Sequence, residues 1–145
     1  RALIGARLKD ADTVTTSLVG LTNNWIYYDS LMTNHDTNRW SCYCTDFAIG
    51  YLGIINESLI YSYTGEIEIL PALPVSGFES GKICGIRTRN RAVVDSLKWN
   101  LAEGTAEVTV TSDIAQTIEI ACGLSEEVQT VTFKEGESKT IAFDI

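Results

Sequence analysis

The spacing of the hydrophobic residues changes near Gly65, and this change constrains the fold more than any other feature of the chain. Before Gly65 the apolar residues recur at helical spacing, whereas after it they alternate with polar residues over short segments. The pattern predicts an α+β protein with helices in residues 1–65 and a β domain in residues 66–145. No low-complexity tract separates the two parts, so no flexible linker is expected between them.

Residues 46–63 form the clearest predicted helix. Thr45 or Asp46 can accept the free N–H groups of its first turn, and Gly65 stands where a left-handed C-terminal cap is expected. Its apolar residues point in nearly every direction around the axis: Phe47, Ile49, Tyr51, Leu52, Ile54, Ile55, Leu59 and Ile60. A helix that is apolar all round must be buried on all sides.

Two short helices are predicted before this one, in residues 2–8 and after a cap at Asp12 or Thr13. They are too small to enclose residues 46–63. The chain also begins at Arg1 inside an apparent helix and without Met. We therefore expect the chain to be the C-terminal piece of a larger protein, preceded by further helices.

The part after Gly65 predicts an antiparallel β-sandwich or barrel. Residues 66–70 alternate as a strand, and Pro71-Ala72-Leu73-Pro74 then interrupts both helix and strand. Six further strands are predicted, separated by turn residues, in residues 82–89, 92–99, 105–112, 117–122, 128–133 and 140–145. Short alternating strands at this spacing are typical of antiparallel sandwiches.

Charge excludes two classes of partner. The net charge is −8, and proteins that bind nucleic acid or anionic membranes need clustered Lys and Arg. We therefore expect no nucleic acid and no membrane as partner, and a neutral ligand such as a sugar is compatible.

Four scattered Cys and one His do not suggest a metal site, and no cofactor is implied. The four Cys predict mostly buried thiols, and a disulfide stays open.

Residues 22–44 combine polar side chains with many aromatic ones. Within them His35, Asp36, Asn38, Arg39 and Trp40 are candidate sugar contacts, because Trp faces stack on pyranose C–H groups while polar side chains bind hydroxyls. Long loops in compact domains are often functional. The alternative is a surface loop whose aromatic residues pack on the helices.

Residues 61–74 (Y-S-Y-T-G-E-I-E-I-L-P-A-L-P) resemble glycoside hydrolase family 95, the α-L-fucosidase and α-L-galactosidase group, at a turn followed by a strand and an L-L-P-A-L-P motif. Residues 85–89 (G-I-R-T-R) are similar to the family's G-L-R-A-R, and residues 6–10 (A-R-L-K-D) are similar to its A-R-L-x-D. Trp99 stands where the family often has a Trp at the end of the next strand. The resemblance implies the last helices of an (α/α)6 barrel followed by a β-sandwich.

The resemblance also implies an inverting glycoside hydrolase that acts on an oligosaccharide with terminal α-L-fucosyl or α-L-galactosyl residues. The position that corresponds to the family's base-side Asp is Asp46, although Phe47 and Ala48 depart from the family's pattern. The general acid would lie upstream of this chain, so we expect the isolated chain to be inactive. Asp46 as a plain helix cap is the alternative, and the two roles are compatible.

Three further points stay open at this level. Glu57 can be a buried acid with a raised pKa or can face a polar partner, and Arg87 and Arg89 can hold the domain interface or stand exposed. A non-catalytic β-sandwich that binds carbohydrate or is purely structural is the second functional hypothesis. A binding sandwich should expose a row of aromatic residues on a sheet.

The expected partners are the oligosaccharide substrate and the missing N-terminal part of the protein. A second copy of the chain is also expected as a partner, since a truncated helical part exposes apolar surface.

Overall fold

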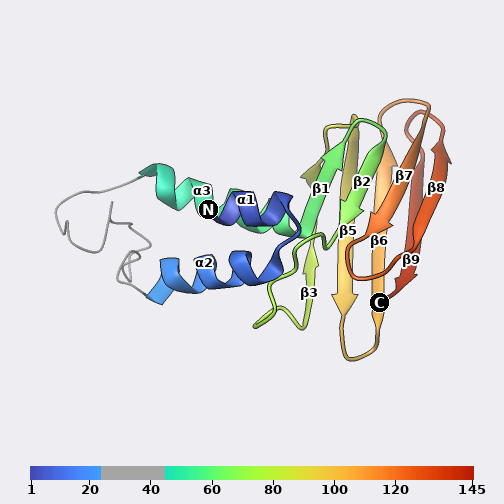
Figure 1. Ribbon diagram of the computed structural model, residues 1–145. Helices are drawn as coiled ribbons and strands as arrows, with labels where there is room; N and C mark the ends of the chain where they lie inside the picture. Colours follow the sequence, from blue (N-terminus) through green and yellow to red (C-terminus); the bar gives the residue numbers. More distant parts are fainter. Residues whose placement is uncertain (24–44) are drawn as a thin grey trace.

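The computed structural model describes residues 1–23 and 45–145, and for residues 23 and 46–48 it describes the backbone alone. Within these residues α1 (Ala2–Arg7), α2 (Ala11–Asn23) and α3 (Thr45–Leu59) lie on one side of two packed β-sheets (Figure 1). We call residues 60–145 the two-sheet part. No helix in the described residues is long and apolar enough to cross a lipid bilayer.

The two-sheet part contains nine strands, with the following bounds. They are β1 (Ile60–Tyr63), β2 (Glu66–Ile69), β3 (Ser80–Ile83), β4 (Ile86–Arg87), β5 (Ala92–Asn100), β6 (Thr105–Ser112), β7 (Gln116–Cys122), β8 (Val128–Phe133) and β9 (Ser138–Asp144). The first sheet has the order β1-β2-β7-β8, and the second has the order β3-β5-β6-β9 with β4 paired to the same edge of β5 as β3. All pairs are antiparallel except β2 with β7.

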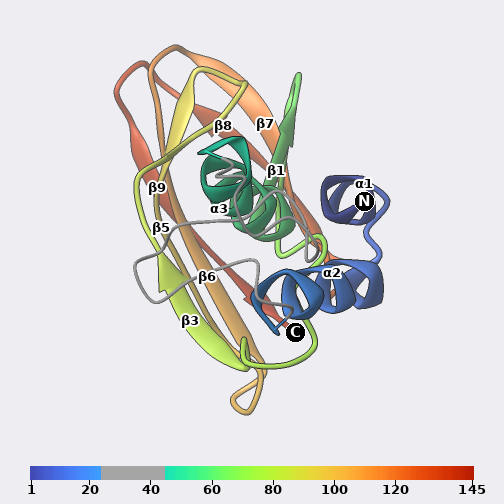
Figure 2. The same cartoon turned by 90° about the vertical axis from the view of Figure 1, so that its left-hand side faces the viewer.

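The core lies between the two sheets. The alternation is most regular on β6, where every second side chain is buried: Ala106, Val108, Val110 and Ser112. One cluster joins the two sheets: Ile67, Ile69, Ile118, Ile120 and Phe133 come from the first sheet, and Val94, Leu97 and Phe143 come from the second. Two apolar inner faces packed together in this way are compatible with the predicted β-sandwich (Figure 2).

The predicted helix over residues 46–63 is wrong at its C-terminal end. The helix stops at Leu59, and Ile60–Tyr63 forms β1, which pairs with β2 in a hairpin. Gly65, with φ of 82°, lies in the hairpin turn and does not cap the helix. Ile60 and Ser62 alternate inward with Tyr61 and Tyr63 outward, so pairing with the next strand outweighs the helical pattern of the apolar residues.

The helix α3 is also not enclosed within the described residues. One side packs through Tyr51, Ile54 and Ile55 on the cluster of α1 and α2 residues, but Ile49 is 72 % exposed and Leu52 is 66 % exposed. The further barrel helices and the domain boundary at residue 65 remain predictions. The change from helix to strand falls at Ile60.

The start of α2 differs slightly from its prediction. The side chain that caps it is Asp10, whose Oδ1 accepts a hydrogen bond from the backbone N–H of Thr13 at 2.9 Å. The Thr13 hydroxyl donates to Oδ2 of the same carboxylate at 2.6 Å. These bonds lower the pKa of Asp10, that from the Thr13 side chain most of all. The predicted caps Asp12 and Thr13 thus lie inside the first turn, because a carboxylate two residues earlier can already satisfy the free N–H groups.

Candidate functional site

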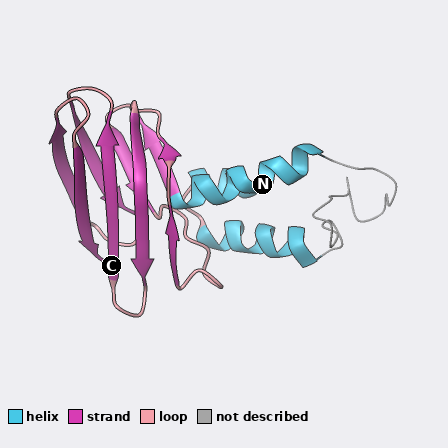
Figure 3. Ribbon diagram, turned by 180° about the vertical axis from the view of Figure 1, so that it is seen from behind, coloured by secondary structure: helices cyan, strands magenta, loops and turns pink. Residues whose placement is uncertain are grey.

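Asp46 is the second residue of α3, at the end of that helix far from the sheets (Figure 3). Its backbone is therefore in the first helical turn, where unpaired N–H groups and the helix dipole favour a carboxylate. The other candidate site residues, His35, Asp36, Asn38, Arg39 and Trp40, lie outside the described residues. The sugar contacts predicted for them stay predictions.

The segment Leu70 to Pro74 (L-P-A-L-P) is the junction between the helices and the sheets. All five of its residues are buried. The N–H of Leu70 donates to the carbonyl of Leu59 at 2.7 Å, and the N–H of Ala72 donates to the carbonyl of Ser58 at 3.1 Å. Ala72 belongs to the same cluster as Ala6, Val14 and Leu18 of α1 and α2. The motif therefore packs the helices on the sheets.

A glycine holds the other side of this junction. The N–H of Gly123, just after β7, donates to the carbonyl of Ile69 at 2.8 Å. A Cβ at Gly123 would overlap the backbone of Leu70 and Pro71. Only a residue without a side chain allows the two segments to approach this closely. The position of the L-P-A-L-P segment is thus fixed by backbone contacts on both sides.

Ion pairs tie the helices to the two-sheet part beside this segment. The Glu57 carboxylate on α3 accepts hydrogen bonds from Arg7 Nε at 3.5 Å and from Arg89 Nη2 at 2.9 Å. Lys9 Nζ lies 2.9 Å from Oε1 of Glu68, whose side chain is 6 % exposed. The paired residues are far apart in the sequence, so no local sequence pattern predicts which of them pair.

Arg89 is the residue that joins most elements here. Its Nη1 donates to the carbonyl of Ser62 at 3.0 Å, and its backbone N–H donates to the Ser62 hydroxyl at 2.9 Å. Its guanidinium carbon lies 5.7 Å from the centre of the Tyr61 ring, within the range of a cation–π contact. Of the two interpretations of Arg89, the one in which it holds the helices to the two-sheet part agrees with these contacts. Of the two interpretations of Glu57, the one in which it faces polar partners agrees with them.

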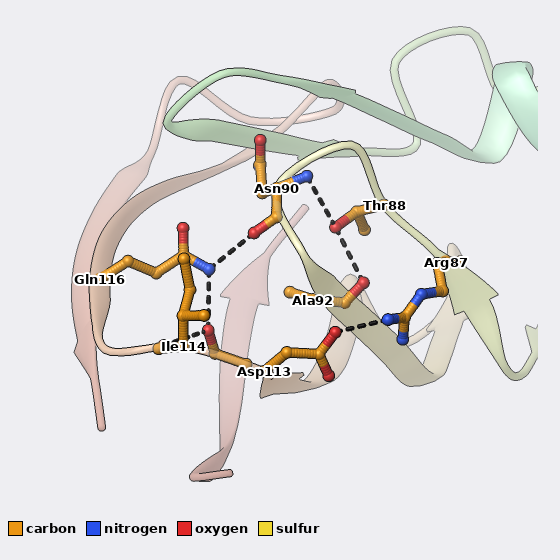
Figure 4. A network of polar contacts seen from close by, with 8 residues as sticks. Arg87, Thr88, Asn90, Ala92, Asp113, Ile114 and Gln116 are labelled. Carbon is orange, nitrogen blue, oxygen red and sulfur yellow. Dashed lines mark hydrogen bonds and ion pairs between the residues drawn. The ribbon is translucent and has the colours of Figure 1, made fainter. Parts of the chain in front are cut away.

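Arg87 behaves differently from Arg89. Its Nη2 donates to Oδ2 of Asp113, on the bend after β6 (Figure 4). The turn between the two arginines is ordered by Thr88, whose hydroxyl donates to the carbonyl of Ala92 at 3.0 Å. Gln116 Nε2 donates to the carbonyl of Asn90 at 2.7 Å. These bonds fix the backbone from which both arginines extend.

Two of the open cavities among the described residues are large enough to consider as sites. A cavity of about 610 Å³ is lined by α1, α2 and Ile54, with a polar wall of Asp12, Thr13, Thr16 and Ser17. A second cavity of about 380 Å³ lies between α3, β1 and β4. Both volumes are in the range of small-ligand sites, and Glu57, Arg87 and Arg89 line the second one.

The sequence profile of the glycoside hydrolase family 95 C-terminal domain matches residues 61–145. The match covers more than half of the chain. The chain belongs to glycoside hydrolase family 95. The family 95 match begins one residue after the start of β1 and extends to the last residue, so it covers the two-sheet part almost completely. No curated protein matches the chain.

Family 95 membership confirms the resemblance that the L-P-A-L-P and G-I-R-T-R segments suggested. Both segments contribute contacts where the helices meet the two-sheet part. The first lies between the helices and β7, and the second carries the two arginines. The motifs thus mark where a helical part attaches to the family 95 C-terminal domain, which is consistent with a glycoside hydrolase whose C-terminal region is this chain.

Proposed function

We propose that this chain is part of an inverting glycoside hydrolase that removes terminal α-L-fucosyl or α-L-galactosyl residues from an oligosaccharide. The observation that supports it most is the family 95 match over the two-sheet part, joined through the buried L-P-A-L-P segment to α3. That helix carries Asp46 in its first turn. The resemblance assigns the base-side carboxylate to this position.

In the proposed reaction Asp46 activates a water molecule on the face of the sugar opposite the leaving group. Inversion leaves room for this water by separating the acid and the base by roughly 6.5–9.5 Å. Carboxylates are in general favoured in the first turn of a helix, and a general base must be ionised to accept a proton. The proton donor belongs to a part of the protein upstream of Arg1.

We further propose that additional helices of an (α/α)6 barrel cover the outer face of the helical part. Its exposed apolar residues support this arrangement: Leu3 at 40 %, Ile4 at 63 %, Leu8 at 73 %, Ile49 at 72 % and Leu52 at 66 % exposure. Several exposed apolar residues on two helices in contact favour an interaction site. Without its cover the chain should self-associate, and a monodisperse monomer by light scattering would contradict this.

The alternative of a carbohydrate-binding sandwich has less support than the enzyme fragment, whereas that of a purely structural sandwich stays open. The aromatic residues after Gly81 are Trp99, Phe133 and Phe143, and all three are buried between the sheets. The strands after β2 therefore expose no aromatic row on which a sugar could stack.

Two assays with an aryl α-L-fucoside test the proposal. The chain alone should show no turnover, since it lacks the proton donor, and measurable hydrolysis by it would refute the assigned division of roles. In a longer protein that contains this chain, Asp46→Asn should lower kcat by about 10²–10⁴-fold, whereas the matched Asp144→Asn on β9 should not. Full activity of the Asp46 variant would exclude it as the base. Proton NMR of the released sugar should show the inverted anomer first.

A further inference from the structure

We propose that the 380 Å³ cavity between α3, β1 and β4 binds the carboxylate of an acidic sugar. Its walls are contributed by Gly53, Asn56 and Glu57 on α3, Ser62 on β1, and Arg87 and Arg89 on β4 and the turn after it. The site lies at the sheet end of α3, and Asp46 lies at the other end. It is thus distinct from the proposed catalytic position.

The charge of this cavity differs from that of the whole chain. Its lining contains two guanidiniums, those of Arg87 and Arg89, and one carboxylate, that of Glu57. Outside the lining, Arg7 pairs with Glu57 and Asp113 pairs with Arg87, so these two charges cancel each other. One positive charge is therefore in excess in a chain whose net charge is −8. A single monoanion would balance this excess, and repulsion from the surrounding surface would favour it over more highly charged ligands.

Arg87 is the residue best placed to bind such an anion. Its side chain is 65 % exposed, and one nitrogen, Nη2, is engaged by Asp113. A guanidinium carries five N–H donors in a planar fork that fits a carboxylate. The turn bonds of Thr88 and Gln116 hold the backbone beside it in place, so the turn itself needs little further ordering on binding.

The rest of the cavity is suited to a polar ligand. Asn56 is exposed on the rim, and its amide can bind a hydroxyl. At Gly53 no side chain fills the cavity, and a Cβ built there meets no atom within 4 Å, so the space beside the helix backbone is open. The choice of a sugar as carrier of the carboxylate rests on the proposed function, whereas the choice of an anion rests on the charges alone.

Titration of the chain itself tests the inference, with amide chemical shifts as readout. D-Galacturonate should shift the signals of Gly53, Ser62 and Arg87 and should bind about tenfold more tightly than neutral D-galactose, the worth of one charged hydrogen bond. Added salt should weaken it. Equal binding of galactose, or shifts confined to other residues, would overturn the proposal. Equal binding of acetate would overturn its sugar component.

Two variants with opposite expected effects on the galacturonate affinity add to the test. Arg87→Gln should lose most of the galacturonate affinity, whereas the matched Arg91→Gln, outside the cavity, should keep it. Asp113→Asn removes the competing partner of Arg87 and should raise the affinity severalfold. If Arg87→Gln fails to fold, the Asp113 variant decides, and unchanged or weaker binding by it contradicts the inference. These measurements need no turnover, so they are independent of the role of Asp46.

Discussion

Arg89, on the turn after β4, donates through Nη2 to Oε1 of Glu57 on α3 at 2.9 Å, and this ion pair joins the helices to the two-sheet part. Glu57 is 19 % exposed and also contacts Arg7. A largely buried carboxylate that loses its partner retains its desolvation cost. The pair therefore fixes how α3 lies on the sheets.

Replacing both partners of this pair should cost less than the two single replacements added together. We expect Arg89→Gln to lower the free energy of unfolding by about 1–3 kcal/mol, since Glu57 is left with the exposed Arg7. The double variant Glu57→Gln with Arg89→Gln should lose less than the sum of the single changes. Urea denaturation measures both, with Arg91→Gln as control. Strict additivity would show that the two side chains are not coupled.

A methyl group at Gly81 should destabilise the two-sheet part. The Cβ would overlap the ring of Trp99, which is 6 % exposed and is held by a 2.8 Å hydrogen bond from Nε1 to the carbonyl of Phe78. We expect Gly81→Ala to cost about 1–3 kcal/mol, as overpacking of a core does. Thermal unfolding followed by circular dichroism measures it. Wild-type stability would mean that the ring moves aside freely.

Gly53 provides the matched glycine-to-alanine control, with the opposite sign. Its added Cβ meets no atom within 4 Å, and alanine is favoured over glycine inside a helix by about 1 kcal/mol. Gly53→Ala should therefore stabilise the isolated chain by up to about that amount in the same unfolding experiment. A loss of stability would indicate that something packs on this face of α3.

The cap of α2 should give stability that depends on pH. The Thr13 hydroxyl and, next, its backbone N–H lower the pKa of Asp10 in the folded state. An acid whose pKa is lower in the folded state than in the unfolded state stabilises the fold at any pH above its pKa in the unfolded state. This contribution is lost as the pH falls through its pKa in the folded state. The difference in Tm between the wild type and Asp10→Asn should thus shrink below about pH 4. A difference that does not change with pH would contradict this role.

The two cysteines in the described residues should differ in reactivity. Burial raises the pKa of the Cys122 thiol, which is 3 % exposed, whereas Cys84 is exposed. The thiolate is the reactive form, so iodoacetamide at neutral pH should label Cys84 in the folded chain and Cys122 only after unfolding. Mass spectrometry of a variant with Ser at positions 42 and 44 separates the two. Equally rapid labelling of Cys122 would show that this end of β7 opens readily.

Much of the two-sheet part could be predicted from local pattern. The bounds predicted for residues 105–112 and 128–133 coincide with β6 and β8. Strict alternation decides a strand because the side-chain period is two, whatever the partner strand is. The predicted strand at residues 82–89 is instead divided into β3 and β4 at Cys84 and Gly85.

The end of α3 could not be predicted in this way. Ile60 and Ser62 fit a helical face as well as an inward strand face, and the choice depends on β2, which pairs Ile60 with Ile69. Of the candidate site, the sequence placed Asp46 near a helix start. The charged cavity could not be foreseen, because Glu57, Ser62 and Arg87 come from three elements.

The sequence by itself determined the change from helices to strands, the alternation of the core and, through its L-P-A-L-P and G-I-R-T-R motifs, the family. These features depend on neighbours within a few residues and on the period of one element. The tertiary structure alone decided that the L-P-A-L-P segment packs against Gly123 and that Glu57 meets Arg89, not Arg87. Such contacts join distant residues, and their geometry exists only once the elements have packed.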